Sequence, residues 1–173
     1  MTGVPPEPET GAESQDSAPV SSCARQKRVV FDTNVLVSLY VFADSRFAPL
    51  RSAVECDEWQ AITNDACLGE FRRVLGYPIF ALDEQTQEAA LAAYRASAIS
   101  HSGRPAGAIP DLPRCKDRDD QKFLELARDS CADWLVTADK ALLQVSRRDR
   151  LRGLFRILTP EAALAETGFQ TMM

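Results

Sequence analysis

Four acidic residues that lie far apart in the sequence could together bind a divalent cation: Asp32, Glu70, Asp120 and Asp139. Carboxylate oxygens are the ligands that Mg²⁺ and Mn²⁺ prefer. The alternatives are few, because the chain has one histidine and its five cysteines include no Cys-x-x-Cys pair. The four acids therefore predict Mg²⁺ or Mn²⁺ chemistry on phosphates.

Two of these acids follow predicted buried strands. Asp32 comes directly after the run Arg28–Phe31, and Asp139 lies two residues beyond the run Trp134–Thr137. Ligands of parallel sheets bind in the crevice beyond the carboxyl ends of the strands. Both carboxylates should open into that crevice if the two strands are neighbours. The structural alternative for each residue is an N-cap, which accepts hydrogen bonds from the first turn of the next helix.

Two polar residues could support these carboxylates. Asn34 lies two positions after Asp32 and could orient it. Thr137 lies two positions before Asp139, and its hydroxyl could bind a phosphate, a water or a neighbouring carboxylate.

The other two acids lie on predicted helices. Glu70 is at the edge of the apolar face of the helix Asn64–Leu75. It is either a rim charge paired with an arginine or a partly buried carboxylate that needs a cation, which a metal would supply. Asp120 is aligned with the core face of the helix Asp119–Ser130. Acids in a first helical turn are also favoured by the helix dipole. Asp117, one turn earlier, could join the metal site or act as the cap.

Strands and helices alternate along the chain, which predicts an α/β protein with a parallel sheet between layers of helices. Strands are expected at Arg28–Phe31, Trp59–Thr63, Trp134–Thr137 and Leu154–Leu158. Helices are expected near Asn34–Phe42, Ala48–Cys56, Asn64–Leu75, Glu84–Ala98, Asp119–Ser130, Lys140–Val145 and Pro160–Ala165.

The composition is that of one globular domain with a short tail. Of 173 residues, 45% are hydrophobic and 26% are charged. Residues 1–26 are rich in Pro, Glu, Ser and Gly and predict a disordered tail, so the domain spans residues 27–173. No signal peptide or membrane-spanning run is evident, and a cytoplasmic location with no membrane partner is expected. The net charge of −5 does not exclude a phosphate-rich substrate when metal ions face the phosphates.

Several segments resemble the motifs of PIN-domain proteins: Val29–Leu36, Asp117–Ala127, Ala132–Leu143 and Ile157–Glu161. The resemblance is closest to a bacterial branch of toxin components of toxin–antitoxin pairs. It implies a three-layer α/β/α sandwich with a central, mainly parallel sheet. It also implies a Mg²⁺- or Mn²⁺-dependent ribonuclease with an RNA substrate, a homodimer and a cognate antitoxin protein as partner.

Carried over by position, the resemblance assigns the family's acidic site to Asp32, Glu70, Asp120 and Asp139, with Thr137 as the polar residue ahead of the last acid. Many relatives have proline at the position of Arg118 and Asp or Asn at the position of Gln121, but neither departure removes a carboxylate.

Two other functions compete with a metal-dependent nuclease. A phosphatase with an aspartyl nucleophile typically needs a second Asp two positions after the first, where this chain has Asn34. A catalytically degenerate PIN fold could instead serve as an RNA- or protein-binding module. No glycine-rich phosphate loop is evident, and no side chain looks suited to be a Ser or Cys nucleophile.

Overall fold

The computed structural model describes residues 25–103, 109–148 and 151–166. The predicted disordered tail, residues 1–26, lies outside the described residues except for Arg25 and Gln26. Within the described ranges, no helix combines the length and the apolar character that a bilayer crossing requires.

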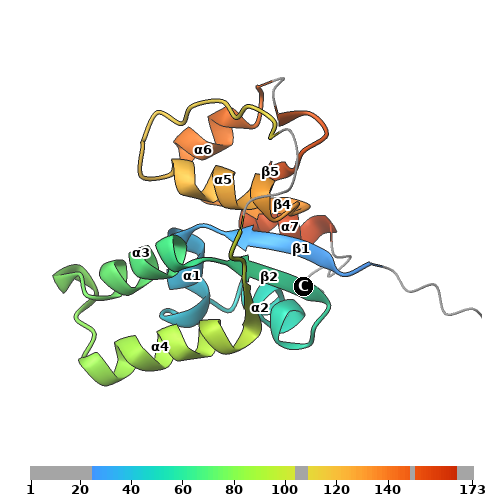
Figure 1. Ribbon diagram of the computed structural model, residues 1–173. Coiled ribbons are helices and arrows are strands. Elements are labelled where there is room, and N and C mark those ends of the chain that lie inside the picture. The colour runs from blue at the N-terminus through green and yellow to red at the C-terminus, as the bar shows by residue number, and fades with distance from the viewer. Residues whose placement is uncertain (1–24, 104–108, 149–150, 167–173) are drawn as a thin grey trace, which may run out of the picture.

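A five-stranded, entirely parallel sheet forms the centre of the protein, with the strand order β3-β2-β1-β4-β5 (Figure 1). The strands are β1 (Lys27–Phe31), β2 (Trp59–Thr63), β3 (Ala98–Ser100), β4 (Trp134–Val136) and β5 (Arg156–Leu158). The first strand in the chain is thus the middle strand of the sheet. Because β1 pairs directly with β4, the two strands that precede Asp32 and Asp139 are neighbours, as the prediction of a shared crevice required.

Helices cover both faces of the sheet, which confirms the three-layer α/β/α sandwich (Figure 1). The helices are α1 (Thr33–Tyr40), α2 (Ala48–Glu55), α3 (Asp65–Leu75), α4 (Glu84–Ser97), α5 (Gln121–Asp129), α6 (Lys140–Val145) and α7 (Pro160–Glu166), with a 3-10 turn, η1, at Pro78–Phe80. One layer contains α1, α2, α4 and α7, and the other contains α5 and α6.

Alternation along the strands divides the core between the two layers. In β1, Val29 and Phe31 point into the cluster under α1, α2 and α4, whereas Val30 points into the cluster under α5 and α6. All three side chains are almost completely buried. Continuous apolar runs of this kind are typical of parallel strands covered on both faces. Helix α3 contributes to both clusters, through Phe71 on one side and Cys67 on the other.

The edge strand β3 was missed in the sequence, where Ala98 was predicted to end a helix. In the structure α4 ends at Ser97, and Ile99 pairs with Ile62 of β2. A strand of three residues with two exposed side chains offers neither an alternation nor a buried run to detect. The start of α5 also differs, because Asp120 is the N-cap residue and the helix begins at Gln121.

Candidate active site at the carboxyl edge of the sheet

Asp32 follows the central strand directly and is 2% exposed. It occupies the N-cap position of α1, but its carboxylate makes no capping hydrogen bond. Its Oδ2 atom instead accepts a hydrogen bond of 2.7 Å from Thr137 Oγ1. Burial raises the pKa of Asp32 above its usual value, and the hydrogen bond from Thr137 offsets part of that increase. The backbone N–H groups of Asn34 and Thr33 also lower the pKa of Asp32, but less than the Thr137 hydroxyl does, so Thr137 is the main polar partner of this carboxylate.

Asp139 does cap a helix, as its structural alternative predicted. Its Oδ1 atom accepts hydrogen bonds from the backbone N–H groups of Ala141 and Leu142, at 2.6 and 3.1 Å. Both bonds use the same oxygen, so the cap does not engage Oδ2. Asp139 therefore has a structural role at the start of α6 and still presents a carboxylate oxygen at the sheet edge.

Thr137 connects the two aspartates. It is completely buried, its hydroxyl donates to Asp32, and the same oxygen accepts a 2.9 Å hydrogen bond from the backbone N–H of Asp139. Of the roles predicted for this hydroxyl, binding to a neighbouring carboxylate is the one observed. Thr137 therefore fixes the orientation of Asp32 relative to the loop that carries Asp139.

Glu70 lies on α3 with a side chain that is 14% exposed. Its Oε1 atom accepts a 3.1 Å hydrogen bond from Thr33 Oγ1, and its Oε2 atom forms an ion pair with the ammonium of Lys122 on α5. The side chain is thus partly buried, as one of its two predicted environments required, but its cation in the structure is the Lys122 ammonium, which neither prediction named. Sequence reasoning missed both Thr33 and Lys122, although each lies within two residues of a predicted acid.

Asp120 is half-buried at the start of α5, and its pKa is raised to about 6. Burial is the main cause, followed by repulsion from Asp32, Asp139, Asp117 and Glu70. This repulsion acts between Asp120 and each of the other four acids, so the fold brings Asp32, Glu70, Asp117 and Asp139 into the surroundings of Asp120.

Asp120 and Asp139 line a hollow of about 570 Å³ together with Lys116, Asp117, Arg118 and Ala141, which we call the acidic hollow. Asp117 is exposed, and its Oδ1 atom accepts a 2.9 Å hydrogen bond from the backbone N–H of Asp119. Asp117 therefore stabilises the turn before α5 and also faces the acidic hollow.

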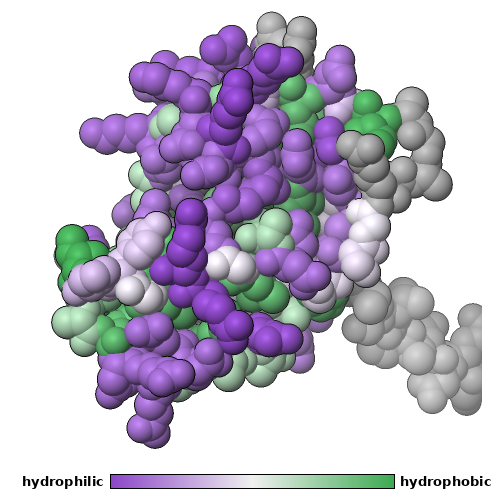
Figure 2. All heavy atoms as spheres, turned by 60° about the vertical axis from the view of Figure 1, so that its left-hand side comes forward, coloured by the Kyte–Doolittle hydropathy of each residue, from purple (hydrophilic) through white to green (hydrophobic). Residues whose placement is uncertain are grey.

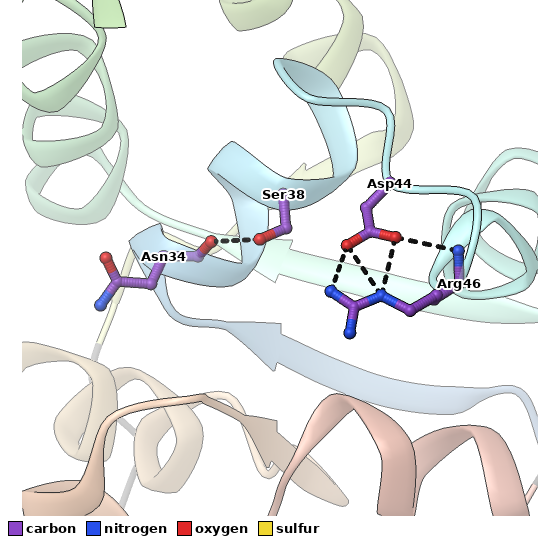
Figure 3. Close-up of polar contacts among 4 residues, drawn as sticks. All are labelled: Asn34, Ser38, Asp44 and Arg46. Carbon is purple, nitrogen blue, oxygen red and sulfur yellow. Dashed lines mark hydrogen bonds and ion pairs between the residues drawn. The ribbon is translucent and has the colours of Figure 1, made fainter. Parts of the chain in front are cut away.

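Asn34 does not support Asp32 with its side chain. The residue is exposed, and in Figure 3 its only marked contact is through the backbone, where the carbonyl oxygen accepts a 3.1 Å hydrogen bond from Ser38 Oγ. The nearby Asp44 and Arg46 form a separate ion pair in the loop after α1 (Figure 3). Asn34 therefore acts on Asp32 through its backbone, whose hydrogen bond lowers the pKa of that carboxylate, and not through its side chain.

The donor set fits a hard divalent cation in its chemistry, because it consists of carboxylate oxygens without histidine or thiolate ligands. The geometry is not that of a closed cage. Among the described residues, no three His, Cys, Asp or Glu side chains lie close enough to hold one ion. Two of the acids already have partners, since Thr137 binds Asp32 and Lys122 binds Glu70.

A thiol near these acids is not a candidate nucleophile. Cys67 is buried on α3, and its pKa is raised to about 12, mainly by burial. Because the thiolate is the reactive form of cysteine, this side chain stays unreactive at neutral pH.

The protein is thus a parallel α/β/α sandwich with a buried aspartate at the end of its central strand. Further carboxylates lie beside this aspartate, so the carboxyl edge of the sheet carries an acidic site. The PIN domain family matches residues 28–141, which is more than half of the chain and includes every predicted site residue, and the chain belongs to this family. PIN domains are generally nucleases, so membership indicates nuclease activity. A comparison with curated proteins found no match.

Replacement of Thr137 by Val is expected to lower the free energy of unfolding by about 1–3 kcal/mol, because the buried Asp32 carboxylate loses its hydrogen-bond donor. The pKa of Asp32 should rise further for the same reason. Urea denaturation measures the loss. Thr137→Ser is the matched control, since it retains the hydroxyl and should stay closer to the wild type. A loss in Thr137→Val that is no larger than the loss in Thr137→Ser would contradict a stabilising role of this hydrogen bond.

Proposed function

We propose that the protein is a divalent-metal-dependent ribonuclease that hydrolyses the phosphodiester bonds of RNA. The observation that supports this function best is the buried Asp32 carboxylate, which does not cap its helix and lies at the end of the central strand beside further carboxylates. A buried carboxylate is costly unless a partner compensates its charge. A divalent cation would provide that compensation.

To hold the ion, Asp32, Asp120 and Asp139 would have to approach one another more closely than they do in this structure, with Glu70 and Asp117 at the periphery of the site. When bound, a divalent ion supplies a water of lowered pKa and offsets the charge that develops on the phosphodiester. Thr137 would restrict the rotation of Asp32, because it holds one of the two carboxylate oxygens. Lys122 would balance the charge of Glu70 while no metal is bound.

The purified protein should therefore cleave a labelled single-stranded RNA with Mn²⁺ or Mg²⁺ and lose at least about 100-fold of its rate in EDTA. Addition of excess Mn²⁺ should restore cleavage, and circular dichroism in EDTA should show that the fold persists. Cleavage that continues unchanged in EDTA would exclude the metal-dependent mechanism. RNA binding without cleavage in Mn²⁺ would favour the alternative function, a catalytically degenerate binding module.

The proposal extends to a biological role as the toxin of a toxin–antitoxin pair, acting as a homodimer. It rests on the sequence resemblance, and exposed apolar side chains support it, since Phe42 is 62% and Ile79 is 84% exposed. Light scattering after gel filtration measures whether the protein is a dimer. Co-expression with the product of an adjacent short reading frame tests for an antitoxin, which should co-purify with the protein and inhibit cleavage.

A further inference from the structure

The segment that leads into α5 presents a row of basic side chains. Pro113 and Cys115 are buried, whereas the alternating residues Arg114 and Lys116 are exposed, and Arg118 is exposed two positions further on. Alternating burial places every second side chain on the same side of the segment. The segment therefore displays three cations on its solvent side.

These side chains line a groove of about 670 Å³ beside α5, which we call the basic groove. Its charged residues are Arg114, Lys116, Arg118 and Arg128, with Glu125 as the acid on its lining. This local excess of positive charge contrasts with the net charge of −5 of the whole chain. The layer that contains α5 and α6, at the top of Figure 2, presents a mostly hydrophilic surface.

Among the described residues, three of the four bases have no polar partner. In the part of the chain that the structure describes, the side chains of Arg114, Lys116 and Arg118 form no hydrogen bond or ion pair. Arg128 differs, because its Nε atom binds Asp129 Oδ1 at 2.7 Å. Like charges held side by side repel one another, and an anionic ligand would remove that repulsion. Three cations are therefore available for a ligand.

The basic groove leads into the acidic hollow. Lys116 and Arg118 line both cavities, and Asp120 and Asp139 lie on the lining of the second. A polyanion bound in the basic groove would thus continue towards the residues that are proposed to hold the metal. An anion site that is unrelated to the acidic hollow would not need to share lining residues with it.

We propose that the basic groove binds the phosphate backbone of single-stranded RNA and guides it into the acidic hollow, an inference that rests on the proposed ribonuclease function. Guanidinium and ammonium groups bind phosphate oxygens with charge-assisted hydrogen bonds, which carry no base sequence information. The described lining residues include no aromatic ring on which a base could stack. The groove therefore binds the backbone and tolerates different sequences.

The test is binding of a fluorescein-labelled 12-nucleotide oligouridine, measured by fluorescence anisotropy in EDTA at 50 to 200 mM salt. The triple variant Arg114→Gln, Lys116→Gln, Arg118→Gln should bind on the order of 100-fold more weakly at the lowest salt. Its plot of log affinity against log salt should be shallower by about 2, because each single-strand phosphate contact contributes about 0.7 to the slope.

The matched control removes three exposed bases elsewhere, in the variant Arg73→Gln, Arg95→Gln, Arg147→Gln, which changes the net charge equally. It should lose less than about threefold in affinity. Equal losses in both triple variants, or unchanged binding in the first, would overturn the proposal. Binding of an oligoglutamate of equal charge with the same affinity would overturn the assignment to nucleic acid.

Because this assay contains no metal, its outcome is independent of the cleavage test. Failure to cleave RNA with Mn²⁺ would remove the proposed ribonuclease function and leave the binding result unaffected. If the basic-groove triple variant binds RNA as the wild type does, and the wild type cleaves RNA with Mn²⁺, only the proposed path of the RNA is contradicted. Thermal denaturation of both triple variants checks that each is folded.

Discussion

The Asp32→Asn variant is expected to lose roughly 100- to 1000-fold of the Mn²⁺-dependent rate of RNA cleavage while remaining folded. The amide has nearly the same shape as the carboxylate, and its oxygen can still accept the hydrogen bond from Thr137. Only the negative charge at the end of the central strand is lost. Cleavage of a labelled RNA under single-turnover conditions measures the effect, and circular dichroism verifies the fold.

Asp133→Asn is the matched control for this variant. Asp133 immediately precedes β4, at the opposite end of the sheet from Thr137, and its Oδ2 atom accepts a 2.8 Å hydrogen bond from the backbone N–H of Arg28. Its removal should lower stability slightly and change the cleavage rate by less than about threefold. Cleavage by Asp32→Asn at the wild-type rate, or equal losses in both variants, would contradict the assignment of Asp32 to the active site.

The second large effect concerns Asp120 and is measurable without any substrate. Its pKa is about 6 in the folded protein and has a reference value of 3.8, so folding favours the protonated form. The stability that this group contributes is fully present below about pH 4 and is lost as the pH rises through about 6. Above pH 7 the ionised Asp120 therefore destabilises the metal-free protein.

The Asp120→Asn variant should consequently be more stable than the wild type at pH 8 in EDTA, by about 1 kcal/mol after allowance for solvent screening. The two proteins should have similar stability at pH 4. A difference of this size corresponds to a Tm increase of about 2–4 °C for a domain of this length. Mn²⁺ should reverse the order at pH 8, because the wild type gains stability from binding the ion and the variant gains less.

Asp119→Asn provides the control, since Asp119 is an exposed neighbour of Asp120 that does not line the acidic hollow. Its Tm should respond to Mn²⁺ as that of the wild type does. Two outcomes would contradict the role of Asp120. One is a wild type that is more stable than Asp120→Asn at pH 8 in EDTA, and the other is an equal increase in Tm with Mn²⁺ in the two proteins.

The parts of the fold that were predictable are those with a local signature. The buried parts of β1, β2 and β4 are mostly apolar, so the sequence predicts these strands to within a residue or two. The pairing of β1 with β4 was assumed and needed the structure, because no local pattern records which distant strand becomes a neighbour. Strand β3 escaped detection because only three residues form it.

The candidate site shows the same division. Asp32 and Asp139 have similar sequence contexts, each following a strand and preceding a helix, yet only Asp139 uses its carboxylate as a cap. The ion pair of Glu70 with Lys122 depends on how α3 packs against α5, which hydrophobic periodicity does not specify. Sequence reasoning could therefore nominate the acids but could not identify their partners.

The central position of β1 determines when the acidic site can be completed during synthesis of the chain. Asp32 is made early, but Thr137, the residue that holds it, follows 105 positions later. Until β4 has been made, β1 can pair only with β2, and its other edge has no native partner. Such long-range pairing slows folding, since distant segments must meet before the sheet is complete. An unfinished chain thus carries Asp32 without Thr137 and Asp139, and the acidic site is complete only when β4 and the loop after it are in place.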